Sequence, residues 1–212
     1  DVTVSTAVVD GAAVAVLLQQ CRDAHLLVVG DRGLGGITGL LLGSVAVQTV
    51  THADCPVLVV RGHRHADGPV VVGVDGSQTS AAALRFAAAE AEARGSELVA
   101  VHSWTGPVST GPGDMLPLVY DPLTVAGDEQ VLLAEAVAAV AGDHPDVVIR
   151  QEVVRGPSRK VLVEKSHQAQ LLVVGARGRG GFAGLILGSV SQHLMYHADC
   201  PTAVVRHNLD PA

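Results

Sequence analysis

Aromatic residues are the scarcest class in this chain of 212 residues, since Phe, Trp and Tyr together make up only 2% of it. Apolar residues still reach 48%, so a core has to be built from Val, Leu, Ala and Ile. Valine-rich strands covered by alanine-rich helices are typical of α/β layering, in which strands buried on both faces form continuous apolar runs. The length allows one or two domains of this kind.

Cysteines and basic residues are also few. Cys21, Cys55 and Cys200 lie far apart and form no CxxC pair, so the sequence encodes neither a disulfide framework nor a zinc site built on cysteine. The net charge of −7 argues against a nucleic-acid-binding surface. No apolar run approaches the roughly 20 residues of a membrane span. We therefore expect a cytoplasmic protein that binds neither nucleic acid nor membrane.

One glycine-rich segment occurs twice. "LLVVGDRGLGGITGLLLGSV" at 26–45 and "LLVVGARGRGGFAGLILGSV" at 171–190 are identical at fifteen of twenty positions, and "HADCP" follows each of them. This self-similarity predicts a tandem repeat. The predicted division is a first copy at 1–62, a charged linker at 63–68, a complete second copy at 69–207 and a tail at 208–212.

The second copy alternates strands with helices. Its predicted strands lie at 69–77 (including a turn), 97–104, 146–154, 169–175 and 200–207. Its predicted helices lie at 79–95, 127–145, 158–168 and 189–198, and a long Gly- and Pro-rich loop is predicted at 105–125. This alternation predicts βαβ units and a parallel five-stranded sheet with helices on both faces.

The first copy is not complete. An offset of 145 residues aligns residues 1–9 with the third strand at 146–154, so the first copy is expected to begin with a third strand. Two strands and two helices then have no counterpart, although the two strands normally lie between the third and the fourth. Unpaired strand edges are costly. We therefore expect the natural protein to carry an N-terminal segment before these residues, or another chain to supply the missing strands.

The repeated glycines suggest an anion site. In the second copy, Gly175 ends a strand, Gly178 follows, and Gly188-Ser189 opens a helix. A strand-end glycine lets a ligand approach the backbone, and the N–H groups at a helix start favour an anion. This chemistry suits a di- or triphosphate. The alternative is that the glycines only form tight turns. Neither GxGxxG nor the lysine of a P-loop is present, which disfavours phosphoryl transfer.

These motifs resemble the universal stress protein family. The pattern G-x2-G-x9-G-[ST] follows "LLVVG", "HADCPVLVVR" comes after it, and "VVVGVDGS" at 70–77 matches the family's opening strand. The resemblance implies a Rossmann-like fold of the adenine-nucleotide alpha-hydrolase type and a tandem-domain member that binds ATP, with or without Mg²⁺. It also implies a nucleotide-dependent regulator or sensor of the stress response. The alternatives are a non-catalytic dimerisation or interaction module with structural glycine loops, or a slow ATPase.

The resemblance also implies which residues hold the nucleotide. Asp75 would lie near the adenosine, Gly73 and Val74 would line the base pocket, and Ser103 would offer backbone groups to the adenine edge. The ribose and phosphates would be lined by Val174, Gly175, Arg177, Gly178, Gly188, Ser189, Val190 and Ser191. In the first copy the matching residues are Gly30, Arg32, Gly33, Gly43, Ser44 and Val45, but Ala46 stands where the second copy has Ser191.

Other candidate sites are weaker. His193 and His197 are spaced i, i+4 on one predicted helix, but no third ligand is evident, so no metal site is predicted. Ser189 lies outside any GxSxG motif, so no catalytic residue is predicted either. The apolar last strand of each copy would lie at a sheet edge, where pairing is favourable. Universal stress proteins dimerise through this strand, so the resemblance implies domain–domain or homodimer pairing there.

Overall fold

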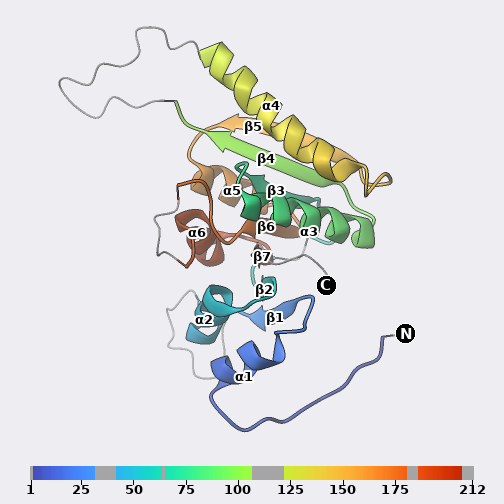
Figure 1. Cartoon of the computed structure of the whole chain (residues 1–212), viewed down its shortest axis with the longest axis vertical. Coiled ribbons are helices and arrows are strands. Elements are labelled where there is room, and N and C mark those ends of the chain that lie inside the picture. Colours follow the sequence, from blue (N-terminus) through green and yellow to red (C-terminus); the bar gives the residue numbers. More distant parts are fainter. Residues whose placement is uncertain (1, 32–41, 64, 107–121, 181–185, 207–212) are drawn as a thin grey trace, which may run out of the picture.

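The computed structural model describes residues 2–31, 42–63, 65–106, 122–180 and 186–206. Its strands are β1 (Leu27–Gly30), β2 (Val57–Val60), β3 (Val70–Val74), β4 (Leu98–Trp104), β5 (Ile149–Arg155), β6 (Leu171–Gly175) and β7 (Thr202–Val205). Its helices are α1 (Ala13–Gln20), α2 (Ser44–His52), α3 (Gln78–Arg94), α4 (Pro122–Ala141), α5 (Ser158–Ser166) and α6 (Ser189–His197). Strands and helices alternate from α1 to β2 and again from β3 to β7, whereas β2 is followed by β3 with no helix between them (Figure 1).

The strands form one seven-stranded sheet in the order β1-β2-β7-β6-β3-β4-β5. The five strands from β7 to β5 are parallel to one another, which confirms the predicted α/β fold. Both β3 and β4 lie between β5 and β6, so the first two strands of the second copy separate its third and fourth strands. Parallel pairing is possible here because a helix crosses over between successive parallel strands.

Two layers of helices cover the sheet. The alanine face of α3 and Leu133, Val137 and Val140 of α4 pack on one face of the sheet. On the other face, α5, α6 and α2 contribute Leu162, Leu194 and Val50 to a second apolar cluster. Small alanines let α3 approach the sheet closely, so a core with almost no aromatic residues still packs tightly.

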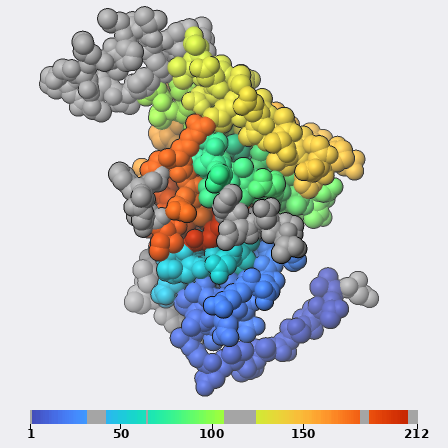
Figure 2. Space-filling view, in the orientation of Figure 1, coloured from blue at the N-terminus to red at the C-terminus, as the bar shows by residue number. Residues whose placement is uncertain are grey.

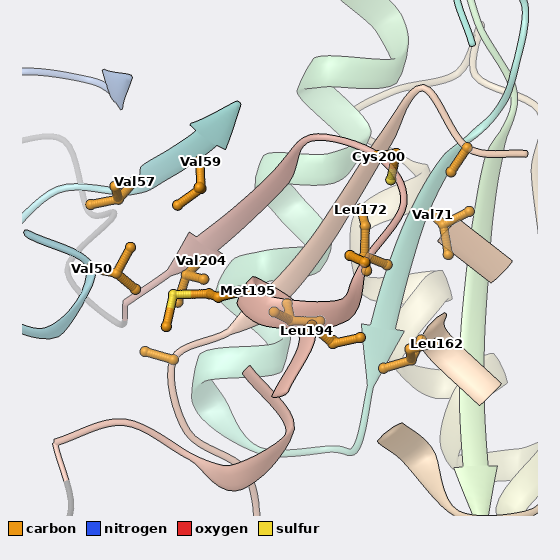
Figure 3. Packing of buried hydrophobic residues seen from close by; sticks show 14 of the residues in the cluster. Val50, Val57, Val59, Val71, Leu162, Leu172, Leu194, Met195, Cys200 and Val204 are labelled. Carbon is orange, nitrogen blue, oxygen red and sulfur yellow. The ribbon is translucent and has the colours of Figure 1, made fainter. Parts of the chain in front are cut away.

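The last strands of the two predicted copies lie side by side. β2 pairs with β7 in the antiparallel direction, with Leu58 opposite Ala203. This contact lies where the sequence analysis expected the two copies to meet. Val50, Val57 and Val59 face Met195 and Val204 across it, as Figure 3 shows. We call this contact, formed by β2, β7, α2 and α6, the seam.

The linker after β2 is fixed to the turn before β7. Gly62 has φ +67°, and a Cβ there would lie 2.2 Å from the carbonyl oxygen of Asp199. This close approach lets the His63 backbone N–H donate to that oxygen at 2.7 Å. The His63 and His167 rings each contact one carboxylate oxygen of Asp199, at 3.0 and 3.2 Å. A glycine at position 62 is therefore required by both conformation and space.

The strand predicted at residues 1–9 is wrong for the described residues 2–9, which form no secondary structure and are exposed. In the second copy, β5 is held by β4 alone. No described residue of the first copy supplies a strand equivalent to β4, so residues 2–9 have no hydrogen-bonding partner for a ladder. Figure 1 shows this segment running away from the sheet.

The boundaries of α4 and β5 also differ from expectation. The helix begins at Pro122, inside the predicted loop at 105–125, and ends at Ala141. Proline is favoured in the first turn of a helix because the N–H that it lacks would have no helical partner there. The strand runs from Ile149 to Arg155 rather than 146–154.

Among the helices of the described residues, none has both the length and the hydropathy that a membrane-spanning helix needs.

Candidate functional site

A cavity of about 440 Å³ lies at the carboxyl ends of β3, β4 and β6, a size in the range of small-molecule sites. Open parallel sheets bind ligands at this edge. The lining residues are Gly73, Val74, Asp75, Ser80, Val101, Ser103, Ser158, Leu162, Val174, Gly175, Arg177, Gly178, Arg179, Gly180, Gly188, Ser189, Val190 and Ser191.

The structure brings together every site residue that the sequence analysis named in the second copy. Sequence reasoning missed Ser80, Val101, Ser158, Leu162, Arg179 and Gly180. Of these, Ser158 could have been predicted from the sequence, because it follows Gly156-Pro157 and begins a predicted helix. Ser80 and Leu162 lie inside helices and reach the cavity only through packing, for which the sequence gives no local sign.

The residues named in the first copy are only partly described. Gly30 ends β1, and Gly43 is the N-cap of α2, which Ser44 and Val45 begin. The Gly43 backbone N–H donates to the Asp31 carbonyl at 2.7 Å, as that of Gly188 does to Ala176. The backbone of the two copies is therefore alike at this point. Arg32 and Gly33 lie outside the described residues.

The Asp75 carboxylate ties the glycine loop to the turn after β3. One oxygen accepts hydrogen bonds from the Ser77 backbone N–H at 3.0 Å and from the Ser77 hydroxyl at 2.6 Å. The other accepts from the Arg179 backbone N–H at 3.0 Å. A Cβ on Gly178 would lie 2.4 Å from this second oxygen. Only a glycine at position 178 therefore lets the loop come this close to Asp75.

These donors change the acidity of Asp75. Burial raises the pKa of this carboxyl, but the hydrogen bonds from Ser77 and Arg179 outweigh it and hold the pKa below its ordinary value of 3.8. Hydrogen bonds to the charged form favour ionisation. The carboxylate thus stays charged at neutral pH and can hold the loop.

We expect Asp75→Asn to remove part of the acid sensitivity of the fold. The unfolded carboxyl takes up a proton at a higher pH than the folded one, so ionised Asp75 stabilises the protein above pH 3.8. That contribution is lost as the pH falls through the lower folded pKa. Urea unfolding at about pH 6 and about pH 3 should show a smaller difference for the Asn variant than for wild type. An equal difference in both proteins would contradict the role of Asp75.

Two helix N-termini line the cavity. The N-caps of α5 and α6 are Pro157 and Gly188, and neither makes a side-chain cap hydrogen bond. Ser158 and Ser189, the first residues of these helices, both line the cavity. The first turn of a helix has N–H groups without helical partners and the positive end of the helix dipole. Both helices can therefore receive an anion.

The Ser191 hydroxyl has a structural role. It is 2% exposed and lies 3.0 Å from the Ala176 carbonyl oxygen and 2.9 Å from that of Gly188, so it donates to the backbone. This contact holds the two ends of the glycine segment together. Ala46, its counterpart in the first copy, cannot make it. Thr79 supports the same segment, because its hydroxyl donates to the Arg177 carbonyl.

A buried histidine fixes the end of β3. His102, 4% exposed, lies with Nδ1 2.7 Å from the Val74 carbonyl and Nε2 2.7 Å from a carboxylate oxygen of Glu129. A carbonyl only accepts hydrogen bonds, so Nδ1 donates to that of Val74. His102 thus links α4 to the strand end that forms one wall of the cavity.

The site combines groups of two kinds. Val74, Val101, Leu162 and Val174 offer an apolar surface, whereas Arg177 and Arg179 offer two cations beside the glycine loop. Within the described residues, no group of three or more His, Cys, Asp or Glu side chains is arranged to hold a metal ion. The arrangement suits a ligand that has both an apolar part and an anionic part.

Several known proteins are similar to this chain in sequence. A profile of the universal stress protein family matches residues 1–61 and 68–206. Universal stress protein Rv2623 of Mycobacterium tuberculosis is 41% identical over 213 residues, which cover 98% of this chain and 70% of the relative. Universal stress protein Mb2019 of Mycobacterium bovis is 39% identical over 212 residues, covering 97% and 66%.

Solved structures agree on the fold. A universal stress protein from Archaeoglobus fulgidus matches with a TM-score of 0.60 and 22% identity, over 93% of this chain and 66% of that one. A universal stress protein in complex with cAMP matches with a TM-score of 0.51 and 24% identity, over 67% and 99%. The family profile and the 41% identical relative show that the chain belongs to the universal stress protein family.

Proposed function

We propose that this chain binds ATP in the cavity at the carboxyl edge of the sheet and acts as a nucleotide-dependent regulator of a stress response. The observation that carries the proposal is the meeting of two uncapped helix N-termini, two arginines and an apolar surface in one cavity. Backbone N–H groups at helix starts are a common way to hold phosphates. A universal stress protein of the same fold has been solved with cAMP, which supports a nucleotide as the ligand.

Each part of the nucleotide has a matching surface. The base would pack between Val74, Val101 and Leu162, beside the backbone of Ser103. The phosphates would lie against the glycine loop, the start of α6 and the two arginines. A triphosphate carries more negative charge than a monophosphate, so the arginines favour ATP over AMP.

Magnesium would be held mainly by the phosphates. Asp75 is the one acidic side chain among the described lining residues, and its carboxylate already accepts three hydrogen bonds. Protein sites for Mg²⁺ usually supply one or two carboxylates and leave the other positions to phosphates and water. The Asp75 carboxylate already accepts these hydrogen bonds, and no other described acidic group in the cavity can act as a general base. This disfavours rapid hydrolysis of ATP.

Isothermal titration calorimetry with ATP, ADP and AMP tests the proposal. We expect one ATP per chain and weaker binding as phosphates are removed. Arg179→Gln should weaken ATP binding by roughly tenfold or more, because a hydrogen bond between charged groups contributes about 1.5–3 kcal/mol. Arg94→Gln, at the far end of α3, is the control and should bind like wild type. Absence of heat with all three nucleotides would contradict the proposal and favour purely structural glycine loops.

A further inference from the structure

Two arginines cross the seam in opposite directions. Arg61, directly after β2, donates to the Met195 carbonyl in the last turn of α6. Arg206, directly after β7, donates through Nη2 to the carbonyls of Val50, at 3.0 Å, and Thr51 in the last turn of α2. Carbonyls at a helix C-terminus lack helical partners and lie at the negative end of the dipole. Each repeat thus caps the last helix of the other.

Arg206 is also a neighbour of the cavity. In the parallel pair of β6 and β7, Gly175 lies opposite Val205, and the Ala176 backbone N–H donates to the Val205 carbonyl at 2.7 Å. The ladder therefore continues past both strands and brings Arg177 and Arg206 to the same edge of the sheet. Arg177 lines the cavity, whereas Arg206 points into α2.

The two guanidinium groups repel each other. Burial lowers the pKa of Arg206, the positive charge of Arg177 lowers it further, and Asp54 acts in the opposite direction. Arg177 is exposed, so an anion can reach it from the cavity. Negative charge beside Arg177 would offset its repulsion of Arg206.

We propose that Arg206 couples the cavity to α2: negative charge held beside Arg177 strengthens the contact between Arg206 and the last turn of α2. α2 and β2 lie directly against the C-terminal elements, as the space-filling view shows (Figure 2), so this contact helps to close the seam. That ATP supplies the charge rests on the proposed function, whereas the relation between the two arginines does not. Coupling of this kind is reciprocal, so a tighter seam also favours the anion.

Hydrogen exchange of the backbone amides in 44–60 tests the coupling without any ligand. Arg177→Gln removes the repelling charge and should slow exchange in α2 by roughly two- to fivefold, the size expected of a partly screened charge pair. Arg179→Gln removes a charge from the same loop and, as the matched control, should leave α2 unchanged. The proposal fails if Arg177→Gln does not slow exchange, or slows it equally when Arg206 is also changed to Gln.

ATP provides the second arm of the test. In wild type, saturating ATP should slow exchange in α2, and in Arg206→Gln it should bind, by calorimetry, without slowing that exchange. ATP that binds wild type and leaves α2 unchanged would overturn the coupling. If calorimetry detects no ATP binding, the proposed function fails, and the variants without ligand still decide whether the two arginines are coupled.

Discussion

Replacing Gly178 by alanine should weaken ATP binding by roughly ten- to a hundredfold while the fold stays intact. The added Cβ would lie 2.4 Å from a carboxylate oxygen of Asp75, well inside van der Waals contact. The carboxylate can move away only by giving up its hydrogen bonds to Ser77 and Arg179. A hydrogen bond to a charged group contributes about 1.5–3 kcal/mol, which corresponds to this range of affinity. The glycine loop would then leave the position in which it lines the cavity.

Gly142, after α4 and outside the cavity, offers a matched control. A Cβ there would meet no atom within 4 Å, so Gly142→Ala should bind ATP like wild type. Neither glycine has the positive φ that would strain an alanine. Calorimetry of the two variants therefore compares one added methyl group at two positions. Equal ATP affinities for both variants would show that the contact between the loop and Asp75 does not shape the site.

Replacing Leu172 by alanine should have the largest effect on stability. Leu172 lies in β6, is fully buried, and packs in the cluster that joins the second repeat to the seam, as Figure 3 shows. Truncating a buried leucine removes apolar contacts and leaves a cavity, which costs about 3 kcal/mol. For a chain of this length, that loss lowers the melting temperature by roughly 6–12 °C.

Val131 is the control for this substitution. It lies on α4 and is 57% exposed, so Val131→Ala removes a comparable apolar group from the surface. The free energy of unfolding should then change by no more than about 0.5 kcal/mol. Thermal or urea unfolding of both variants measures the difference. A loss for Leu172→Ala as small as that for Val131→Ala would contradict the description of the core.

The fold of the second repeat could be predicted because its local signals agree. The strand "LLVVG" is apolar throughout, as burial on both faces requires, and Gly95 ends α3 in the left-handed conformation. Residues 2–9 are predicted wrongly because their local pattern disagrees with their surroundings in the fold. Their valines resemble a strand, but a strand also needs a partner, and a repeat pattern cannot supply one. The sequence pattern places Pro122 in a loop, so it does not predict that α4 begins at this residue.

The site could be predicted where its residues belong to a continuous motif. Gly175, Gly178 and Gly188 follow fixed spacings, so one segment indicates them all. Arg179 lies within the same segment, yet its backbone contact with Asp75 depends on how two distant turns meet. The role of Arg206 is even harder to predict from the sequence. Its role depends on the antiparallel pairing of β2 with β7, which brings α2 within reach.

The most direct test of a nucleotide site in this cavity is a two-dimensional NMR titration of protein labelled with ¹⁵N-glycine. The glycines of the cavity and those at remote helix ends report separately. With ATP, the amide signals of Gly175, Gly178 and Gly188 should shift, whereas those of Gly95 and Gly142 should stay in place. Unchanged cavity glycines at saturating ATP, or shifts confined to the remote ones, would contradict the proposed site.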